Sequence, residues 1–234
     1  MSEPRYSWLL LDADDTLFDF RLAARAALQK TLTWAGLPFS EEARSIFERI
    51  NLEVWESFER NEISVDRLRL ERFERFLDVI GEFRNPAEMS RYYLTVLSQH
   101  AFLLPGAETF LEELRRRGVE LVLVTNGLSE VQRPRIATSR LDRYFRHIVV
   151  SDEIGVSKPD AAFFEMTFEK MGQPSRSKVL MVGDSLSSDV GGGNGFGLHT
   201  CWFNPEGRQN LSVHNPTYEV RSYEEIMRIV EGGA

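Results

Sequence analysis

The chain has 234 residues, of which 42% are hydrophobic and 27% are charged, as in an ordinary globular protein with one large domain or a core and a smaller insert. A net charge of -8 argues against nucleic-acid binding, which needs a basic face. The single cysteine, Cys201, excludes an internal disulfide, and no apolar stretch approaches the ~18 residues that cross a bilayer. No apolar targeting segment is visible. We therefore expect a cytoplasmic protein that binds neither nucleic acid nor membrane.

The first predicted element is a short strand, Trp8-Leu9-Leu10-Leu11, followed at once by Asp12-Ala13-Asp14-Asp15-Thr16. Such an uninterrupted apolar run is typical of a central parallel strand that is buried on both faces. Open α/β sheets carry their active sites at the carboxyl ends of the strands. Three crowded carboxylates repel one another unless a cation or a reaction uses them. Aspartate is also common in turns, so the distinction between an active site and an ordinary turn depends on the rest of the chain.

Residues 19–100 show only helical periodicity. The apolar spacing predicts four amphipathic helices, the first of them from about Leu22 to Trp34 and the last from Met89 to His100. Ser40 and Ser64 are the expected N-caps of the second and third helices. This pattern predicts a four-helix bundle that is inserted directly after the first strand.

From residue 101 onward, predicted strands and helices alternate. The apolar strands are expected at residues 119–124, 147–150, 178–182 and 200–203. Repeated βα units predict an α/β fold with a doubly wound parallel sheet, similar to a Rossmann fold. We therefore divide the chain into a core domain of residues 1–18 and 101–234 and a helical domain of residues 19–100.

Two local features do not fit regular helices. Pro134 falls inside the helix expected after residue 127, so that helix either begins late or kinks. The run Gly191-Gly192-Gly193-Asn194-Gly195 falls where a helix is expected, at a cost of about 1 kcal/mol per glycine relative to alanine. We expect this run to weaken the rigidity behind Asp189. Asp15 and Asp19 are interpreted as turn or loop residues, and Cys201 as a packing residue.

Three further polar clusters follow predicted strands. They are Thr125-Asn126-Gly127, Lys158-Pro159, and Gly183-Asp184-Ser185 together with Asp189. Each cluster alone is compatible with a turn. Because the carboxyl ends of parallel strands share one edge of the sheet, all of them can converge with Asp12 on one crevice.

The residue types in these clusters suit phosphoryl transfer. Carboxylates at positions 12, 14, 184 and 189 supply the hard oxygen ligands that Mg²⁺ prefers. The hydroxyl of Thr125 and the ammonium of Lys158 suit a phosphoryl group. An aspartate can attack phosphorus, and a second carboxylate two residues further on can protonate the leaving alcohol and then activate water.

In this order the four clusters resemble the four motifs of the haloacid dehalogenase superfamily. The resemblance implies that Asp12 is the nucleophile, that Asp14 is the general acid and base, and that Thr125, Asn126 and Lys158 bind the phosphate. It further implies that Mg²⁺ is held by the Asp12 carboxylate, the Asp14 backbone carbonyl and Asp184. Asp189 then supports the metal or its bound waters without being a direct ligand. The helical insert is then a cap that closes over the substrate and excludes water.

Within this superfamily the chain is most similar to the pyrimidine 5′-nucleotidases. The similar segments are Asp-Ala-Asp-Asp-Thr-Leu-Phe, Asn51-(x)₃-Trp55-(x)₂-Phe58, Arg72-Phe73, Thr125-Asn126-Gly127-(x)₄-Gln132-(x)₂-Arg135 and Thr200-Cys201-Trp202. The resemblance implies a substrate that is a pyrimidine nucleoside monophosphate, with Asn51, Trp55 and Arg72 as candidate substrate residues of the cap. Trp55 can stack on a base, but it also neighbours the apolar stripe of its helix, so a packing role stays open.

Other functions are compatible with parts of this pattern. A phosphatase of broad specificity, or one acting on a sugar phosphate or phosphoglycolate, would use the same core motifs. A 2-haloacid dehalogenase would leave Asp14 and the second acidic cluster without a purpose. A phospho-acceptor domain of the receiver type is about half as long and lacks a helical insert. A binding module that has lost catalysis is disfavoured because every residue that the chemistry requires is present. The sequence predicts no oligomeric state.

Overall fold

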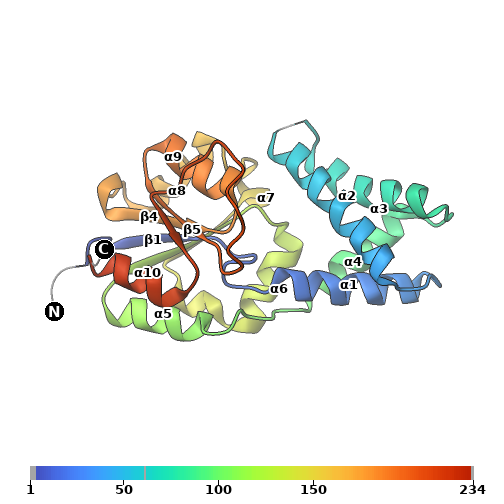
Figure 1. Ribbon diagram of the computed structural model, residues 1–234, viewed down its shortest axis with the longest axis horizontal. Helices are drawn as coiled ribbons and strands as arrows, with labels where there is room; N and C mark the ends of the chain where they lie inside the picture. The colour runs from blue at the N-terminus through green and yellow to red at the C-terminus, as the bar shows by residue number, and fades with distance from the viewer. Residues whose placement is uncertain (1–3, 61, 233–234) are drawn as a thin grey trace. The chain divides into compact units, whose positions relative to one another are not determined.

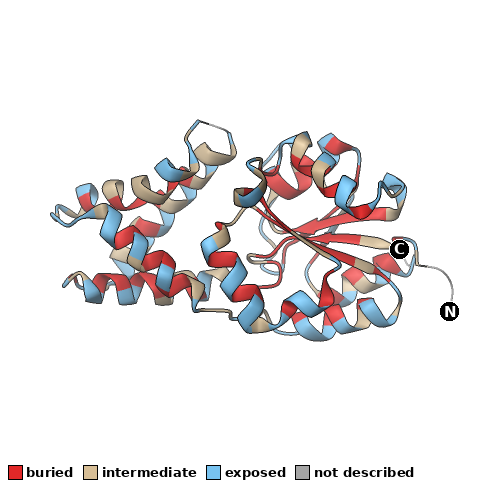
Figure 2. Ribbon diagram, turned by 180° about the vertical axis from the view of Figure 1, so that it is seen from behind, coloured by how far each residue is buried: buried red, intermediate tan, exposed pale blue. Residues whose placement is uncertain are grey.

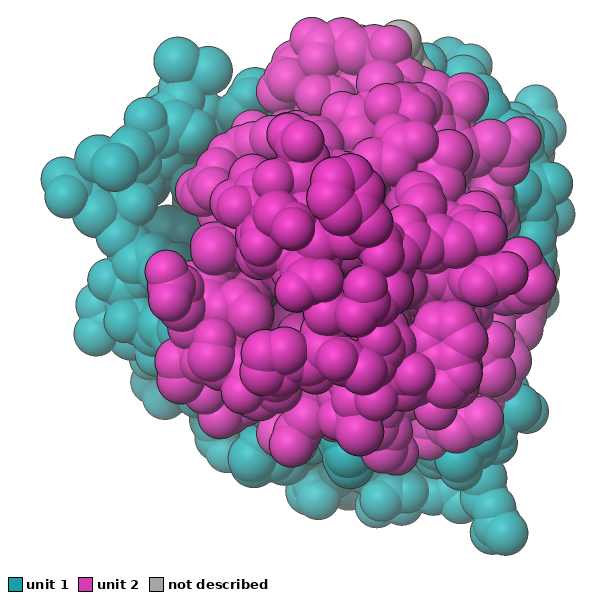
Figure 3. All heavy atoms as spheres, turned by 90° about the vertical axis from the view of Figure 1, so that its right-hand side faces the viewer, with its two compact units in different colours: residues 1–19, 102–129, 136–234 teal, residues 20–101, 130–135 magenta. Residues whose placement is uncertain are grey.

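The computed structural model describes residues 4–60 and 62–232. The chain forms two compact units, which Figure 3 shows in different colours. The first, called the α/β unit here, runs up to Asp19 and contains residues 102–129 and everything from Ile136 onward. The second, called the helical unit, contains residues 20–101 and also residues 130–135. The sequence does not predict that this last segment groups with the helical insert.

Among the residues that the structure describes, the α/β unit contains six parallel strands, which match the predicted doubly wound sheet. The strands are β1 (Trp8–Leu11), β2 (Glu120–Thr125), β3 (His147–Val150), β4 (Val179–Gly183), β5 (His199–Phe203) and β6 (Tyr218–Val220). Strand β6 is not predicted from the sequence, because three residues are too few to show a period. The other five lie within one or two residues of their predicted positions.

The strand order is β3-β2-β1-β4-β5-β6, so β1 lies between β2 and β4. Leu11, the last residue of β1, pairs with Leu123 on one side and with Val182 on the other. The chain leaves β1 toward β2 and later returns to β4, so the winding direction reverses at β1. Open α/β sheets bind their ligands at such a reversal, beyond the carboxyl ends of the strands. Asp12 is the first residue past that end.

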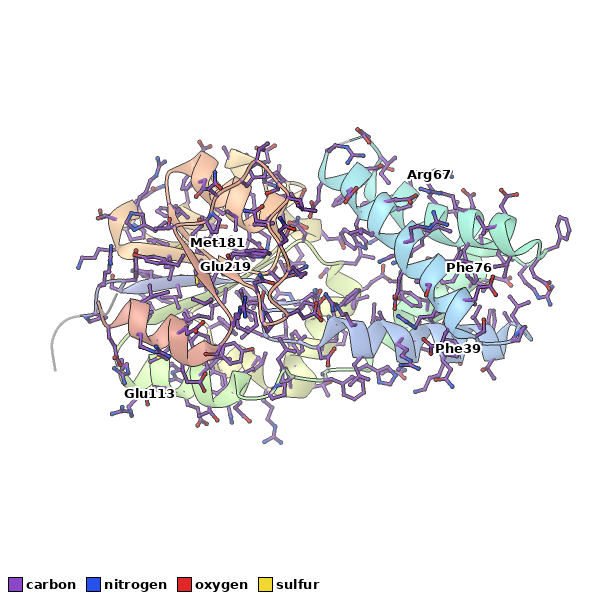
Figure 4. The ribbon with its side chains drawn as sticks, viewed as in Figure 1. Phe39, Arg67, Phe76, Glu113, Met181 and Glu219 are labelled. Carbon is purple, nitrogen blue, oxygen red and sulfur yellow. The ribbon has the colours of Figure 1, made fainter. Side chains whose placement is uncertain are left out.

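Helices cover both faces of this sheet (Figure 1). Helices α8 (Ala161–Met171) and α9 (Gly192–Phe196) pack on one face, where their phenylalanines join Leu10, Val122 and Met181 in one buried cluster. Met181 is labelled on β4 in Figure 4. Helices α5 (Ala107–Arg116) and α10 (Tyr223–Val230) contact each other on the opposite face. Figure 2 shows the buried residues concentrated along the strands and the inner sides of these helices.

The other helices in the described part of the chain, outside the four of the helical unit, are short or are shared between the two units. They are α6 (Ser129–Ser139), α7 (Ser151–Ile154), the 3₁₀ segments η1 (Leu141–Tyr144) and η2 (Arg176–Lys178), and the π-helical turn η3 (Leu186–Gly191). Helix α6 begins at Ser129, so Pro134 lies inside the helix, and of the two alternatives left open by the sequence the late start is wrong. Among the described residues, no helix is long and apolar enough to cross a membrane.

Four helices form the main part of the helical unit: α1 (Phe20–Trp34), α2 (Glu41–Glu59), α3 (Val65–Ile80) and α4 (Pro86–Ser98). The side chains of Ser40 and Ser64 cap α2 and α3, as predicted. Helix α4 ends at Ser98, two residues before the predicted end at His100. Packing explains the arrangement, because Phe47 of α2 lies against Phe73 of α3 and Tyr93 of α4. Phe76, labelled on α3 in Figure 4, completes this aromatic core.

Candidate active site

The loop after β1 holds Asp12 at the sheet edge through backbone contacts. The Asp12 amide donates a hydrogen bond to the Val182 carbonyl at 3.0 Å, which continues the β1–β4 pairing by one residue. The amides of Leu17 and Phe18 both donate to the Ala13 carbonyl, so the chain folds back directly after Asp12. Asp15 takes a left-handed conformation with φ of 52°, which confirms its turn role. Asp14 follows Asp12 in this loop and is partly exposed.

Lys158 is buried, with 1% of its surface exposed, and all three donors of its ammonium group are used. Its Nζ donates to Asp12 Oδ1 at 2.6 Å, to Asp189 Oδ1 at 2.7 Å and to the Val124 carbonyl at 3.0 Å. Burial alone lowers the pKa of Lys158, but the two carboxylates outweigh burial and raise this pKa above its ordinary value. Lys158 therefore carries a fixed positive charge between Asp12 and Asp189.

Asn126 holds the backbone of Lys158. The Asn126 side chain donates to the Lys158 carbonyl at 2.8 Å and accepts from the Lys158 amide at 2.9 Å. Both ends of this amide group are thus engaged, and Asn126 contributes to the site by fixing Lys158. The Thr125 hydroxyl is buried and accepts a hydrogen bond from the Gly127 amide at 3.0 Å. The structure thereby brings together all four of the predicted strand-end clusters.

Three carboxylates form a cluster that could hold a cation. Asp12, Asp184 and Asp189 each present an oxygen, and these atoms lie within 4.8 Å of one another. Burial, followed by the neighbouring charges of Asp189 and Asp15, raises the pKa of Asp184 to about 7. Burial also raises the pKa of Asp12 well above its usual range, against the opposing effect of Lys158. A set of closely spaced carboxylate oxygens of this kind fits a hard divalent cation.

Asp189 is the most constrained member of this cluster. Its Oδ1 accepts from Lys158, and its Oδ2 accepts from the Ser185 amide at 3.1 Å. Since both oxygens already have donors, its position suits the support of Asp12 and Lys158. Gly183 is required for this placement, because a Cβ there would lie 2.0 Å from Asp189 Oδ2. No larger residue fits at position 183 unless Asp189 moves.

Glycines of the run after Asp189 pack closely against neighbouring elements, and the expected loss of rigidity in this region stays a prediction. A Cβ at Gly192 would lie 2.8 Å from the backbone of Pro159, the residue after Lys158. A Cβ at Gly193 would lie 2.7 Å from Thr200. The glycines let α9 closely approach β5 and the segment Lys158-Pro159, which is called the lysine loop here. A sequence pattern alone shows the lost helix propensity of glycine and hides the contact that requires it.

Comparison with known proteins decides the family. Residues 6–197 match the family described as a hydrolase, haloacid dehalogenase-like hydrolase. The chain belongs to the haloacid dehalogenase-like hydrolases. The resemblance seen in the sequence is thereby confirmed at the level of the family.

Relatives of known name cover nearly the whole of this hydrolase. The pyrimidine 5′-nucleotidase PynA of Streptococcus pneumoniae is 34% identical over 95% of this chain and 94% of its own. The pyrimidine 5′-nucleotidase YjjG of Escherichia coli is 31% identical over 97% of this chain and 98% of its own. The crystal structure of the putative HAD-hydrolase YfnB of Bacillus subtilis, which is bound to magnesium, is 34% identical with a TM-score of 0.91, over 97% of this chain and 99% of its own.

Two residues of this haloacid dehalogenase-like hydrolase fix the position of Asp184, and the sequence singled out only one of them, Trp202. The Asp184 carbonyl accepts hydrogen bonds from Trp202 Nε1 at 2.9 Å and from Arg208 Nη2 at 3.0 Å. Asn204, which is fully buried, exchanges two hydrogen bonds with the Arg208 backbone and so holds the loop that carries this arginine. Arg208 lies in a polar loop with no motif, so no sequence signal indicated its role.

The candidate substrate residues of the cap lie in the helical unit. Trp55 on α2 is partly buried and contacts the edge of Phe58 at 5.8 Å between ring centroids. Asn51, one turn earlier, accepts a long hydrogen bond of 3.4 Å from Arg72 Nη1. Gln132 and Arg135 are buried in the same unit and bond to each other at 3.1 Å. The structure therefore brings Asn51 and Arg72 together. The position of Trp55 is compatible both with packing and with binding a ligand.

Proposed function

We propose that this hydrolase is a Mg²⁺-dependent phosphomonoesterase that forms an aspartyl-phosphate on Asp12. The observation that carries the proposal is the position of the Asp12 carboxylate. It lies at the central strand end, 2.6 Å from the Lys158 ammonium, and shares a cluster with Asp184 and Asp189. Asp12, Asp184 and the Asp14 carbonyl would hold the metal, which would neutralise charge on the phosphoryl oxygens.

The proposed reaction has two steps. An Asp12 oxygen attacks phosphorus, the bond from phosphorus to the ester oxygen breaks, and Asp14 gives a proton to the departing alcohol. Asp14 then takes a proton from water, the water oxygen attacks phosphorus, and the bond to Asp12 breaks to release phosphate. Lys158 neutralises negative charge at Asp12 throughout, while the backbone amide of Asp12 stays fixed on Val182. The Thr125 hydroxyl would bind a phosphoryl oxygen, and Asn126 would act through Lys158.

We further propose that the substrate is a pyrimidine nucleoside monophosphate. Two relatives that align with almost the whole chain carry the name pyrimidine 5′-nucleotidase, at 34% and 31% identity. Asn51, Trp55 and Arg72 are the residues proposed to contact the leaving nucleoside, with the helical unit as the cap. A panel of dUMP, UMP, dTMP, sugar phosphates and phosphoglycolate tests this assignment. A clear preference for a sugar phosphate or for phosphoglycolate would overturn it.

Asp12→Asn is the sharpest test of the nucleophile. The substitution removes the attacking oxygen but keeps the size of the side chain, so turnover of dUMP should fall by several orders of magnitude. Asp142→Asn, at an exposed position of η1, is the matched control and should leave turnover unchanged. Acid-quenched wild-type enzyme should carry one phosphoryl group on the peptide that contains Asp12. Retained turnover in Asp12→Asn would rule out this mechanism.

A further inference from the structure

Arg72 differs from the other arginines of helix α3. Arg67, Arg69 and Arg75 each form an ion pair with a glutamate on the surface of the helical unit. Arg72 lies on the buried face, in register with Leu68 and Phe76, and only 2% of its surface is exposed. It makes no ion pair among the described residues. A charged residue has thus replaced the apolar residue expected at this position of the helical pattern.

The hydrogen-bonding capacity of Arg72 is largely unused. Nη1 makes the long contact of 3.4 Å with Asn51 Oδ1. The buried Nε and Nη2 atoms have no hydrogen-bond partner among the described residues. These two atoms belong to one edge of the planar guanidinium, and their N–H groups point in the same direction. This unpaired edge has the geometry to bind two acceptor atoms at once, or one carbonyl oxygen twice, when a ligand gains access to it.

Packing in the helical unit offsets only part of the free-energy cost of burying the charge of Arg72. The guanidinium carbon lies 5.0 Å from the ring centroid of Tyr93 and 6.0 Å from that of Phe73. Such cation–π contacts return less free energy than the burial of an unpaired charge costs. An apolar side chain of similar volume would be expected to stabilise this position. Buried donors without acceptors in a folded protein call for a functional explanation.

We propose that Arg72 is a specificity-determining residue that binds the carbonyl edge of the pyrimidine ring through Nε and Nη2. This inference rests on the proposed nucleotidase function and adds to it the atoms that recognise the base. Pyrimidines present carbonyl oxygens on their ring edge, and arginine forks recognise acceptors on base edges in this way. Besides its proposed contact with the nucleoside, Asn51 positions Arg72, because its Oδ1 accepts from the remaining nitrogen and so sets the direction of the unpaired edge.

The experiment compares dUMP with 2-deoxyribose 5-phosphate, which is the same ester without the base. Arg72→Met removes the donors and keeps most of the volume. We expect it to lower kcat/KM for dUMP about 10–100-fold. The value for 2-deoxyribose 5-phosphate should change less than about twofold, because that ester makes no contact with the fork. The thermal unfolding midpoint should equal or exceed that of the wild type, since an unpaired buried charge has been removed.

Two further variants separate the fork from charge and from general damage. Arg72→Lys keeps the positive charge without the planar edge and should not restore dUMP turnover. Arg75→Met, on the same helix but partly exposed and paired with Glu53, should change neither kcat/KM value. A fall in kcat/KM that is equal for both esters, together with a lower unfolding midpoint, would show a purely structural role and overturn the inference.

The remaining outcomes also decide the matter. If Arg72→Met impairs turnover of phosphoglycolate more than that of dUMP, the fork recognises a carboxylate and the assignment to pyrimidines is wrong. If the wild type does not prefer dUMP to 2-deoxyribose 5-phosphate, the proposed nucleotidase function itself fails. This second failure appears in the wild-type measurement, before any variant of Arg72 is made, so the two failures are distinguishable.

Discussion

Lys158 in the α/β unit and Arg72 in the helical unit are both buried cations, yet their surroundings are opposite. Lys158 donates to two carboxylates and a backbone carbonyl, so no donor of its ammonium is left over. Arg72 makes one long hydrogen bond, and two of its three nitrogens have no hydrogen-bond partner among the described residues. The first cation is satisfied before any ligand arrives. The second keeps two nitrogens without a hydrogen-bond partner among the described residues.

This difference matches the roles proposed for the two units. Chemistry at phosphorus needs groups that are fixed in advance, because preorganised charge costs no rearrangement during the reaction. In the α/β unit, Lys158, Asn126 and Asp189 hold one another in place. Recognition of a leaving group instead needs donors that gain a partner only when the correct ligand binds, since unpaired donors discriminate against ligands that lack the acceptor. Arg72 has this property.

The largest effect that tests the comparison is expected from Lys158→Met. This substitution leaves Asp12 and Asp189 buried without their shared counter-charge, which should lower the free energy of unfolding by about 3–5 kcal/mol. Urea denaturation with a chelator present measures this loss. Lys170→Met, at an exposed position of α8, should stay within about 0.5 kcal/mol of the wild type. If Lys158→Met and Arg72→Met changed stability equally, the contrast between the two cations would be lost.

A smaller loss is expected from Gly183→Ala, which tests how tightly the α/β site is built. The new Cβ would lie 2.0 Å from Asp189 Oδ2 and 2.3 Å from Asp189 Cγ, so Asp189 must shift. Overpacking of this kind costs about 1–3 kcal/mol. Because Asp189 belongs to the carboxylate cluster, Mg²⁺ affinity measured by calorimetry should also fall, about 10–100-fold. Unchanged stability together with unchanged Mg²⁺ affinity would show that the site tolerates movement of Asp189.

The sequence predicts the α/β site better than the helical unit for a physical reason. Apolar strands followed by Asp12, Thr125 or Asp184 are local patterns, and parallel pairing then brings their ends together without further information. The Asn126–Lys158 contact joins residues 32 positions apart and has no local signature. In the helical unit, periodicity predicts four helices, and serines predict the N-caps of two of them, but neither signal can tell which buried positions lack a partner. Arg72 is seen as unusual only once its neighbours are known.

Tertiary contacts also determine which glycines of α9 are required. The sequence alone indicates only that glycine has a low helix propensity. A Cβ added at Gly192 or Gly193 would meet backbone or side-chain atoms within 3 Å, whereas one added at Gly195 on the same helix would meet none within 4 Å. The same residue type is therefore required at two positions and unnecessary at a third. The distinction separates the part of α9 that supports the lysine loop from the part that faces solvent.

The smallest expected effect, and the only gain predicted within the α/β unit, is that of Gly195→Ala. This position is helical and exposed, and the added methyl group meets no atom within 4 Å beyond the neighbouring backbone of its own helix. Alanine restricts the unfolded chain more than glycine does, so the free energy of unfolding should rise by about 0.4–1 kcal/mol. Thermal denaturation measures the gain, and a loss of stability in Gly195→Ala would contradict the free volume at this position.

Gly197→Ala is the matched control for this last substitution. Its nearest contact, Arg176 at 3.6 Å, is ordinary, but its φ of 83° is unfavourable for alanine, so stability should fall. The two variants together distinguish conformational strain from lack of space. Since a Cβ at Gly195 would touch none of the residues that hold Lys158, turnover in Gly195→Ala should stay unchanged. This result would indicate that only the closely packed glycines of α9 matter for the geometry of the site.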